Sequence, residues 1–135
     1  MAEIIVVDTN VIITAIISGS PYVLGRLSDP AVTVASPKFI VVELFKHSPR
    51  IQKSTSLSED EVLDTLSRVI ERIKLYEEAS VSIGSWAEAY RLCRDVDEKD
   101  TPFVSLALEL NARLWTNDAR LRRGLKRYGF LRFYE

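Results

Sequence analysis

The sequence has little of several residue types on which particular kinds of site depend. Its 135 residues include one cysteine, Cys93, and one histidine, His47. A single cysteine excludes an internal disulfide. One cysteine and one histidine together are too few ligands for a structural zinc site. Helical spacing places Cys93 near the apolar residues Trp86, Ala89 and Tyr90. We therefore expect Cys93 to be a buried structural thiol and His47, without a fixed partner, to lie at the surface.

Long apolar runs and an excess of positive charge are also missing. No run approaches the roughly 18 to 20 residues that cross a bilayer. The N-terminal segment MAEIIVVDTN has no basic stretch before its apolar residues, so we expect a cytoplasmic protein with no membrane partner. The 18 Lys and Arg and 19 Asp and Glu give a net charge of -1. This excludes a chain that is basic throughout, but charge can still gather on one face.

The pattern of apolar residues predicts an α/β domain. A length of 135 residues with 47% hydrophobic and 27% charged residues indicates a single domain spanning residues 1–135. Residues 4–7, Ile-Ile-Val-Val, form a continuous β-branched run, which is typical of a strand buried on both faces of a parallel sheet. Strands and helices then alternate along the chain, which favours a mainly parallel sheet with helices on both faces.

The individual elements are expected as follows. Strands are predicted at 4–7, at 32–35, somewhere within 73–83, at 114–116 and at 130–134. Helices are predicted at about 11–17 with Asn10 as cap, at 22–27, from Pro37 onward, at 58–73, at 85–94, after Asp100, and around 121–125. The polar segments 48–57 and 95–100 are expected to be loops. Ser58 and Glu61 have the spacing of a capping box, and the amphipathic helix after them is expected to serve packing or self-association.

Acidic residues occur where the predicted strands end. Asp8 follows the first strand and Asp118 follows the strand at 114–116, while Asp100 precedes a helix and Glu43 lies in the helix after the second strand. Ligands of α/β sheets bind beyond the carboxyl ends of the strands, so these acids are expected to converge. Helix capping alone would explain Asp100 or Asp118. Four converging carboxylates, however, favour an oxygen-coordinated Mg²⁺ or Mn²⁺ rather than Zn²⁺.

These motifs resemble those of the PIN-domain nucleases, a family that includes the VapC toxins of toxin–antitoxin pairs. The resemblance is carried by IIVVDTN at residues 4–10, Glu43 in FIVVELFKH, Asp100 in DTPFVSLALEL, and Asp118 in LWTND. Each motif is short, but their order and the 18-residue step from Asp100 to Asp118 agree with the family. The similarity spans nearly the whole chain.

The resemblance implies a Rossmann-like three-layer α/β/α sandwich. It also implies that the four acids are catalytic, that they bind Mg²⁺ or Mn²⁺, and that metal-activated water hydrolyses RNA phosphodiester bonds. Homodimers are frequent in the family, and a toxin role would add an antitoxin protein as partner. Asp97 stands three residues before Asp100, and two interpretations remain open for it: a solvated loop residue or a further metal ligand.

Candidate substrate contacts adjoin the acids. Asn10, Thr116 and Asn117 could hold water or phosphate, although capping and turn formation explain the asparagines equally well. Between residues 113 and 132 there are seven basic residues against one acid, a local balance of +6. A solvated helix face is the plain interpretation of this run. Its start at Asp118 favours phosphate binding instead. Arg120, Arg123 and Lys126 are the first expected contacts, and Arg122 and Arg127 are included in the same hypothesis.

Two rival classes can be compared with this hypothesis. A phosphoaspartyl hydrolase or receiver domain also carries an Asp after its first strand. The hydrolase has a second Asp two residues later, where this chain has Asn10, and Glu3 lies too far back to serve a receiver. The other rival is a non-catalytic RNA-binding or scaffold module of the same fold. The presence of all four acids argues against it.

Overall fold

A four-stranded, all-parallel sheet forms the centre of the computed structural model, which describes residues 2–135. The strand order is β3-β2-β1-β4. The elements are β1 (Glu3–Val7), α1 (Thr9–Ser18), α2 (Pro21–Arg26), β2 (Val32–Pro37), α3 (Ile40–Lys46), α4 (Ser48–Ser54), α5 (Glu59–Glu71), β3 (Lys74–Tyr76), α6 (Ile83–Cys93), α7 (Thr101–Leu110), β4 (Arg113–Trp115) and α8 (Ala119–Arg127), with short 3-10 helices η1 (Glu78–Ser80) and η2 (Glu98–Asp100).

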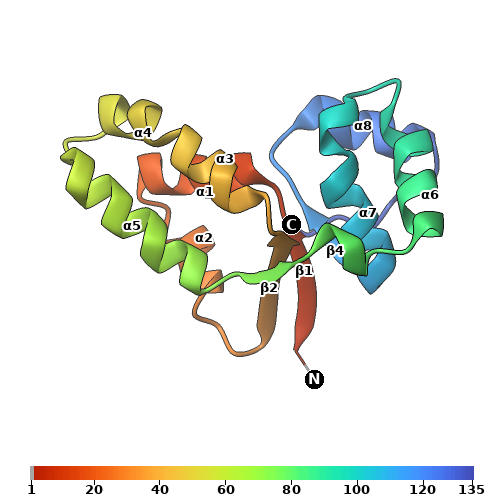
Figure 1. Ribbon diagram of the computed structural model, residues 1–135, viewed down its shortest axis with the longest axis horizontal. Coiled ribbons are helices and arrows are strands. Elements are labelled where there is room, and N and C mark those ends of the chain that lie inside the picture. The colour runs from red at the N-terminus through yellow and green to blue at the C-terminus, as the bar shows by residue number, and fades with distance from the viewer. Residues whose placement is uncertain (1) are drawn as a thin grey trace.

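Helices cover both faces of this sheet. Helices α1 to α5 lie to one side and α6 to α8 to the other, which gives three layers (Figure 1). Strand β1 pairs with both β2 and β4, and its Ile5, Val6 and Val7 have no exposed surface. The predicted α/β/α sandwich with a parallel central sheet is therefore confirmed. No helix formed by residues 2–135 is long and apolar enough to cross a membrane.

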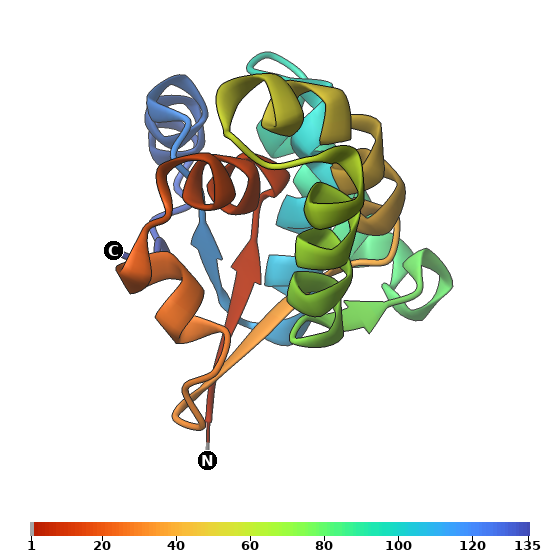
Figure 2. The ribbon, with the colours of Figure 1, turned by 90° about the vertical axis from the view of Figure 1, so that its left-hand side faces the viewer.

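The parallel arrangement brings the carboxyl ends of the strands to one edge. Strands β1 and β4 point the same way, and the N-termini of α1 and α8 follow at that edge (Figure 2). Val7 is in register with Trp115, so Asp8 and Thr116 emerge next to each other. This edge is the place where the sequence predicted the acids to meet.

Three predicted features near the N-terminal half are wrong. Asp8, not Asn10, caps α1, because the Asp8 carboxylate accepts a hydrogen bond from the Asn10 backbone N–H at 3.2 Å. Pro37 ends β2 instead of starting a helix, and α3 begins at Ile40. The predicted loop 48–57 contains α4, which accepts Pro49 in its first turn and is anchored by the fully buried Ile51.

The C-terminal prediction also needs correction. The expected strand at 130–134 is reduced to one isolated parallel bridge between Leu114 and Phe133. Phe130 and Phe133 are buried and pack edge to face, so the aromatic residues there serve the core as irregular chain. Apolar alternation alone could not distinguish this packing from a strand.

Helix α5 agrees with its prediction in detail. The Ser58 hydroxyl accepts from the Glu61 backbone N–H, and the Glu61 carboxylate accepts from the Ser58 backbone N–H, which completes a capping box. Val62, Leu66 and Val69 are buried on one face. The helix thus packs on the core through its apolar stripe, as its periodicity indicated.

Candidate functional site

Asp8 is fixed at the end of β1 by bonds from three directions. Its backbone N–H donates to the Trp115 carbonyl at 2.9 Å, which extends the pairing of β1 with β4 by one residue. One carboxylate oxygen accepts from Asn10 N–H, and the other accepts from the Thr116 hydroxyl at 2.8 Å. Only 6% of Asp8 is exposed. The side chain is therefore buried and oriented, and it is the best-held acid of the site.

Glu43 reaches the same site from α3. Its carboxylate accepts a hydrogen bond from the Thr9 hydroxyl at 2.9 Å. Thr9 is the residue directly after Asp8, so the start of α1 connects the two acids. The structure thus brings Asp8 and Glu43 together as the sequence predicted.

Asp100 lies at the start of α7 but does not act as its cap. Its side chain makes no capping hydrogen bond, and α7 instead begins with Pro102 in its first turn. Asp97 caps the short helix η2, because its carboxylate accepts a hydrogen bond from the Lys99 backbone N–H at 3.0 Å. The purely structural explanation of Asp100 therefore loses its support, whereas Asp97 has a local structural role of its own.

Asp118 joins the cluster from the end of β4 and keeps a capping role. Its carboxylate accepts from the Leu121 backbone N–H at 3.0 Å and so begins α8. Its own backbone N–H donates to the Thr116 hydroxyl at 3.1 Å, and that hydroxyl donates to Asp8. A polar chain thus runs from Asp118 through Thr116 to Asp8 and fixes the β4 end against the β1 end.

A cavity of about 160 Å³ opens between these elements. Four of the predicted acids line it, while Asp118 stands beside it and acts through its charge. The lining residues are Asp8, Thr9, Asn10, Glu43, His47, Asp97, Lys99, Asp100 and Phe103.

Three of these lining residues were not expected in the site. His47 was expected at the surface, but it lies one helical turn after Glu43, and residues four apart share a face. That spacing was the available signal. Phe103 is buried against Phe39, with ring centroids 5.1 Å apart, and it lines the cavity. Lys99 could be identified only from the fold, because its sequence neighbours are charged as well.

Two of these carboxylates, Asp8 and Asp100, have a raised pKa. Burial raises the pKa of Asp100 to about 7, and the charges of Asp8, Asp97, Asp118 and Glu43 add to the shift. Burial also raises the pKa of Asp8, partly opposed by the hydrogen bonds from Thr116 and Asn10. Across residues 2–135, none of these five acids forms an ion pair with a basic side chain. The ionised forms of Asp8 and Asp100 are therefore destabilised, and no ion pair within the described residues offsets this.

The donor set fits a hard divalent cation. All the groups are carboxylate oxygens, the ligands preferred by Mg²⁺ and Mn²⁺. In the part of the chain that the structure describes, no group of three or more His, Cys, Asp or Glu side chains is placed so that it could hold a metal ion. The chemistry of the site thus matches such an ion, while the side chains are not arranged as a finished coordination shell.

The predicted substrate residues take different positions. Asn10 is exposed and lines the cavity, and Asn117 is exposed beside Asp118. Thr116 is only 2% exposed and its hydroxyl is bound to Asp8, so it positions that acid instead of contacting substrate. Arg120, Arg123 and Lys126 lie on α8, which begins at Asp118.

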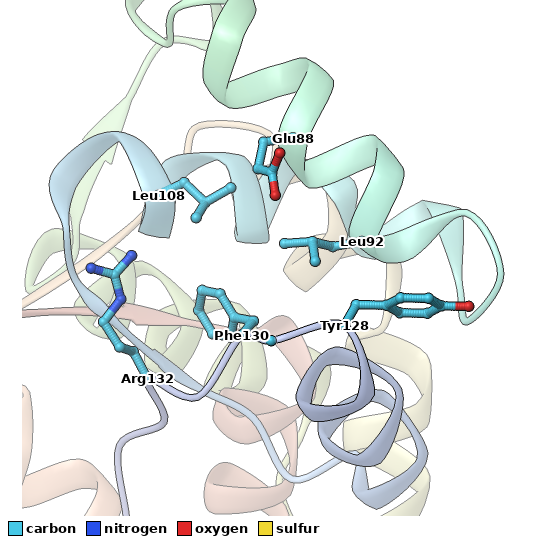
Figure 3. Close-up of a pocket in the computed structure, with 7 residues that line it drawn as sticks. Glu88, Leu92, Leu108, Tyr128, Phe130 and Arg132 are labelled. Atoms are coloured by element: carbon cyan, nitrogen blue, oxygen red, sulfur yellow. The ribbon is translucent and has the colours of Figure 1, made fainter.

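Other features do not contribute a second site of this kind. A cavity of about 310 Å³ lies between α6, α7 and the C-terminal segment (Figure 3), with Glu88 as its only carboxylate. Cys93 is fully buried, as expected, and burial raises the pKa of its thiol to about 12. A thiol with such a pKa remains protonated near neutral pH and is a poor nucleophile.

Comparison with known proteins identifies the family to which the chain belongs. Residues 6–129 match the family model of the PIN domain, so the chain belongs to the PIN-domain family. No protein with a curated description matches the chain.

Similar folds occur in three solved VapBC structures. VapBC from Salmonella typhimurium, bound to DNA, has a TM-score of 0.72 at 17% identity, covering 99% of this chain and 98% of that one. VapBC2 from Rickettsia felis, bound to a promoter DNA fragment, has a TM-score of 0.69 at 18% identity. The match covers 89% of this chain and 92% of that one. VapBC-1 from nontypeable Haemophilus influenzae has a TM-score of 0.60 at 20% identity. The match covers 92% of this chain and 93% of that one. At these identities the likeness establishes the fold that they share.

Proposed function

We propose that this protein is a ribonuclease that uses Mg²⁺ or Mn²⁺ to hydrolyse RNA phosphodiester bonds. The observation that carries the proposal is the cluster of acids around the buried Asp8: within residues 2–135 none of them forms an ion pair, and the pKa of Asp100 is raised to about 7. A fold gains nothing from such repulsion, so the arrangement makes sense when a cation is bound. In the proposal Asp8, Asp97, Asp100 and Asp118 hold the ion, and Glu43 completes the acidic set.

The residues around the acidic cluster each have a definable role in this proposal. When bound, the ion supplies Lewis-acid stabilisation of the phosphoryl charge and an activated water. Thr116 and the Asn10 backbone N–H hold both oxygens of Asp8, and Thr9 fixes the direction of Glu43. Asn10 is exposed in the lining of the cavity and Asn117 is exposed beside Asp118, so their amides would be available to orient a phosphate or a water. Basic residues of α8 would hold flanking phosphates.

The family also supports a proposal about partners. We propose that the protein is the toxin of a toxin–antitoxin pair, because three solved structures that share its fold are VapBC assemblies. We also propose that it forms a homodimer, as its family resemblance implies. Co-purification with the product of an adjacent small gene would test the antitoxin partner. Light scattering after size-exclusion chromatography would test the dimer.

Cleavage of an end-labelled RNA tests the central proposal. We expect cleavage in Mn²⁺ or Mg²⁺, loss in EDTA, and recovery when Mn²⁺ is added in excess. Asp64→Asn is the matched control: it changes an acid that is exposed on α5 and paired with Arg68, far from the cluster in the chain. It should cleave like wild type. Absence of metal-dependent cleavage on varied RNA pools would favour the non-catalytic module of the same fold.

A further inference from the structure

Helix α8 divides its basic residues between two faces, and one face is occupied. Arg122 forms an ion pair with Glu135, and its guanidinium lies 4.9 Å from the centre of the Phe133 ring. The Lys126 ammonium lies 5.7 Å from the same ring. Both cations therefore contact the C-terminal segment, and the charge of Arg122 is paired there with Glu135.

The other face lines a cavity of about 200 Å³. Arg120, Arg123 and Arg127 have spacings of three and four residues, which place them on one side of the helix. Within the region 2–135, none of the three forms an ion pair. The one acid of the lining, Asp95, accepts a hydrogen bond from the Tyr128 hydroxyl at 3.3 Å. The cavity therefore has an excess of positive charge.

Gly124 sets the position of this cavity relative to the acids. A Cβ atom on Gly124 would stand 2.3 Å from Cγ2 of Val96, so only glycine allows α8 to approach this closely. Val96 lies directly before Asp97, and α8 itself starts from Asp118. Both walls of the cavity thus continue into segments that carry acids of the proposed active site.

We infer that the Arg120–Arg123–Arg127 cavity binds the sugar-phosphate backbone of the RNA beside the cleaved bond. The inference rests on the proposed function and narrows it: of the five basic residues of α8 that the sequence offered, it keeps Arg120, Arg123 and Arg127 and leaves out Arg122 and Lys126. Guanidinium groups bind phosphate through paired N–H donors. At about 1.5 Å of rise per residue the row extends roughly 10 Å along α8, a length over which more than one phosphate can lie.

Two substitutions on the same helix separate this site from a general effect of charge. Arg123→Gln and Lys126→Gln each remove one positive charge, but only the first changes the cavity. The binding of a fluorescein-labelled single-stranded RNA is measured by anisotropy in EDTA, between 50 and 200 mM salt. We expect Arg123→Gln to weaken binding about tenfold and to lower the salt slope by about 0.7. Lys126→Gln should leave the slope unchanged; equal effects of both variants would overturn the inference.

A second pair of variants tests the position of the cavity without changing charge. Gly124→Ala should push α8 away from Val96 and weaken RNA binding, and Val96→Ala in the same chain should restore it by removing the colliding methyl groups. Thermal melting of both variants reports folding. Weakened binding that the second substitution does not restore, in a folded protein, would contradict the role of this contact.

The outcomes also distinguish the cavity from the proposed nuclease activity. Selective loss of binding in Arg123→Gln, with no metal-dependent cleavage by wild type, would support the cavity and reject the activity. Metal-dependent cleavage together with equal effects of Arg123→Gln and Lys126→Gln would support the activity and reject the cavity.

Discussion

Helices α1 and α5 both begin with a side-chain cap, yet the pKa values of the acids at the two starts are shifted in opposite directions. At α5, Ser58 and Glu61 cap each other in solvent, and the hydrogen bond from the Ser58 backbone lowers the pKa of Glu61. At α1, Asp8 also accepts from the backbone, but burial and its acidic neighbours raise its pKa. A capping role therefore accounts for Glu61 in full and for Asp8 only in part.

The difference between the two starts shows how a structural acid and a functional acid can be distinguished. A cap that serves only the helix gains from ionisation, because the carboxylate meets N–H donors and the positive end of the helix. Asp8 has the same donors and still pays for burial among like charges. We attribute that cost to ion binding.

Asp8→Asn should abolish RNA cleavage while leaving the protein folded. Asn caps helices about as well as Asp, so α1 should still form, but the ligand charge is lost. We expect cleavage with Mn²⁺ to fall by a factor on the order of 10³, measured on a labelled RNA. Glu61→Gln makes the equivalent change at α5 and should cleave normally. Equal activity of the two variants would remove the distinction between the two helix starts.

Leu66→Asp should unfold the protein or nearly so. Leu66 is fully buried on the inner face of α5, and an unpaired carboxylate there costs about 4 kcal/mol or more. Denaturant unfolding followed by circular dichroism measures the loss. A native unfolding curve would show that α5 does not hold the core, and the assignment of this helix to packing would be wrong.

Raising the pH should destabilise the metal-free protein. The folded-state pKa of Asp100, about 7, lies above the ordinary value of 3.8, so the folded protein keeps a proton that the unfolded chain has lost. Its contribution is fully present below about pH 4 and disappears as pH rises through 7. A difference of one pKa unit corresponds to about 1.4 kcal/mol. Solvent screening reduces the contribution of Asp100 to the free energy of unfolding to roughly 2 kcal/mol. Denaturant curves in EDTA from pH 5 to pH 8 would measure this, with Asp100→Asn as control.

Ser58→Ala should lower stability by about 1 kcal/mol and leave cleavage unchanged. The substitution removes the hydroxyl that accepts from Glu61 N–H, and nothing else in the site depends on it. Chemical denaturation and the RNA assay measure the two effects. A loss of activity beyond that explained by unfolding would connect α5 to the active site.

Much of the architecture followed from local sequence. The apolar run at 4–7 and the capping box at Ser58 act through nearest neighbours. The strand-end positions of Asp8 and Asp118 predicted their convergence, because parallel strands share an edge. Element types failed where tertiary packing decided them: α4 forms around the buried Ile51, and residues 130–134 pack without pairing as a strand.

The roles of single side chains were harder to predict. Sequence could not show that Thr116 is buried beneath Asp8, or that the basic residues of α8 divide between a C-terminal contact and a cavity. Both facts depend on which elements pack together. The close approach at Gly124 likewise becomes visible only once Val96 is in place.

The most direct test of the carboxylate site is the unfolding free energy of wild type and Asp100→Asn at pH 8, each in EDTA and in saturating Mn²⁺. In EDTA the variant should be as stable as wild type or more so, because it removes a charge that caps no helix. Mn²⁺ at a hundredfold excess over its dissociation constant should add about 2.7 kcal/mol to wild type, and clearly less to the variant. A variant that is weaker in EDTA and gains as much from Mn²⁺ would make Asp100 a structural residue and contradict the account.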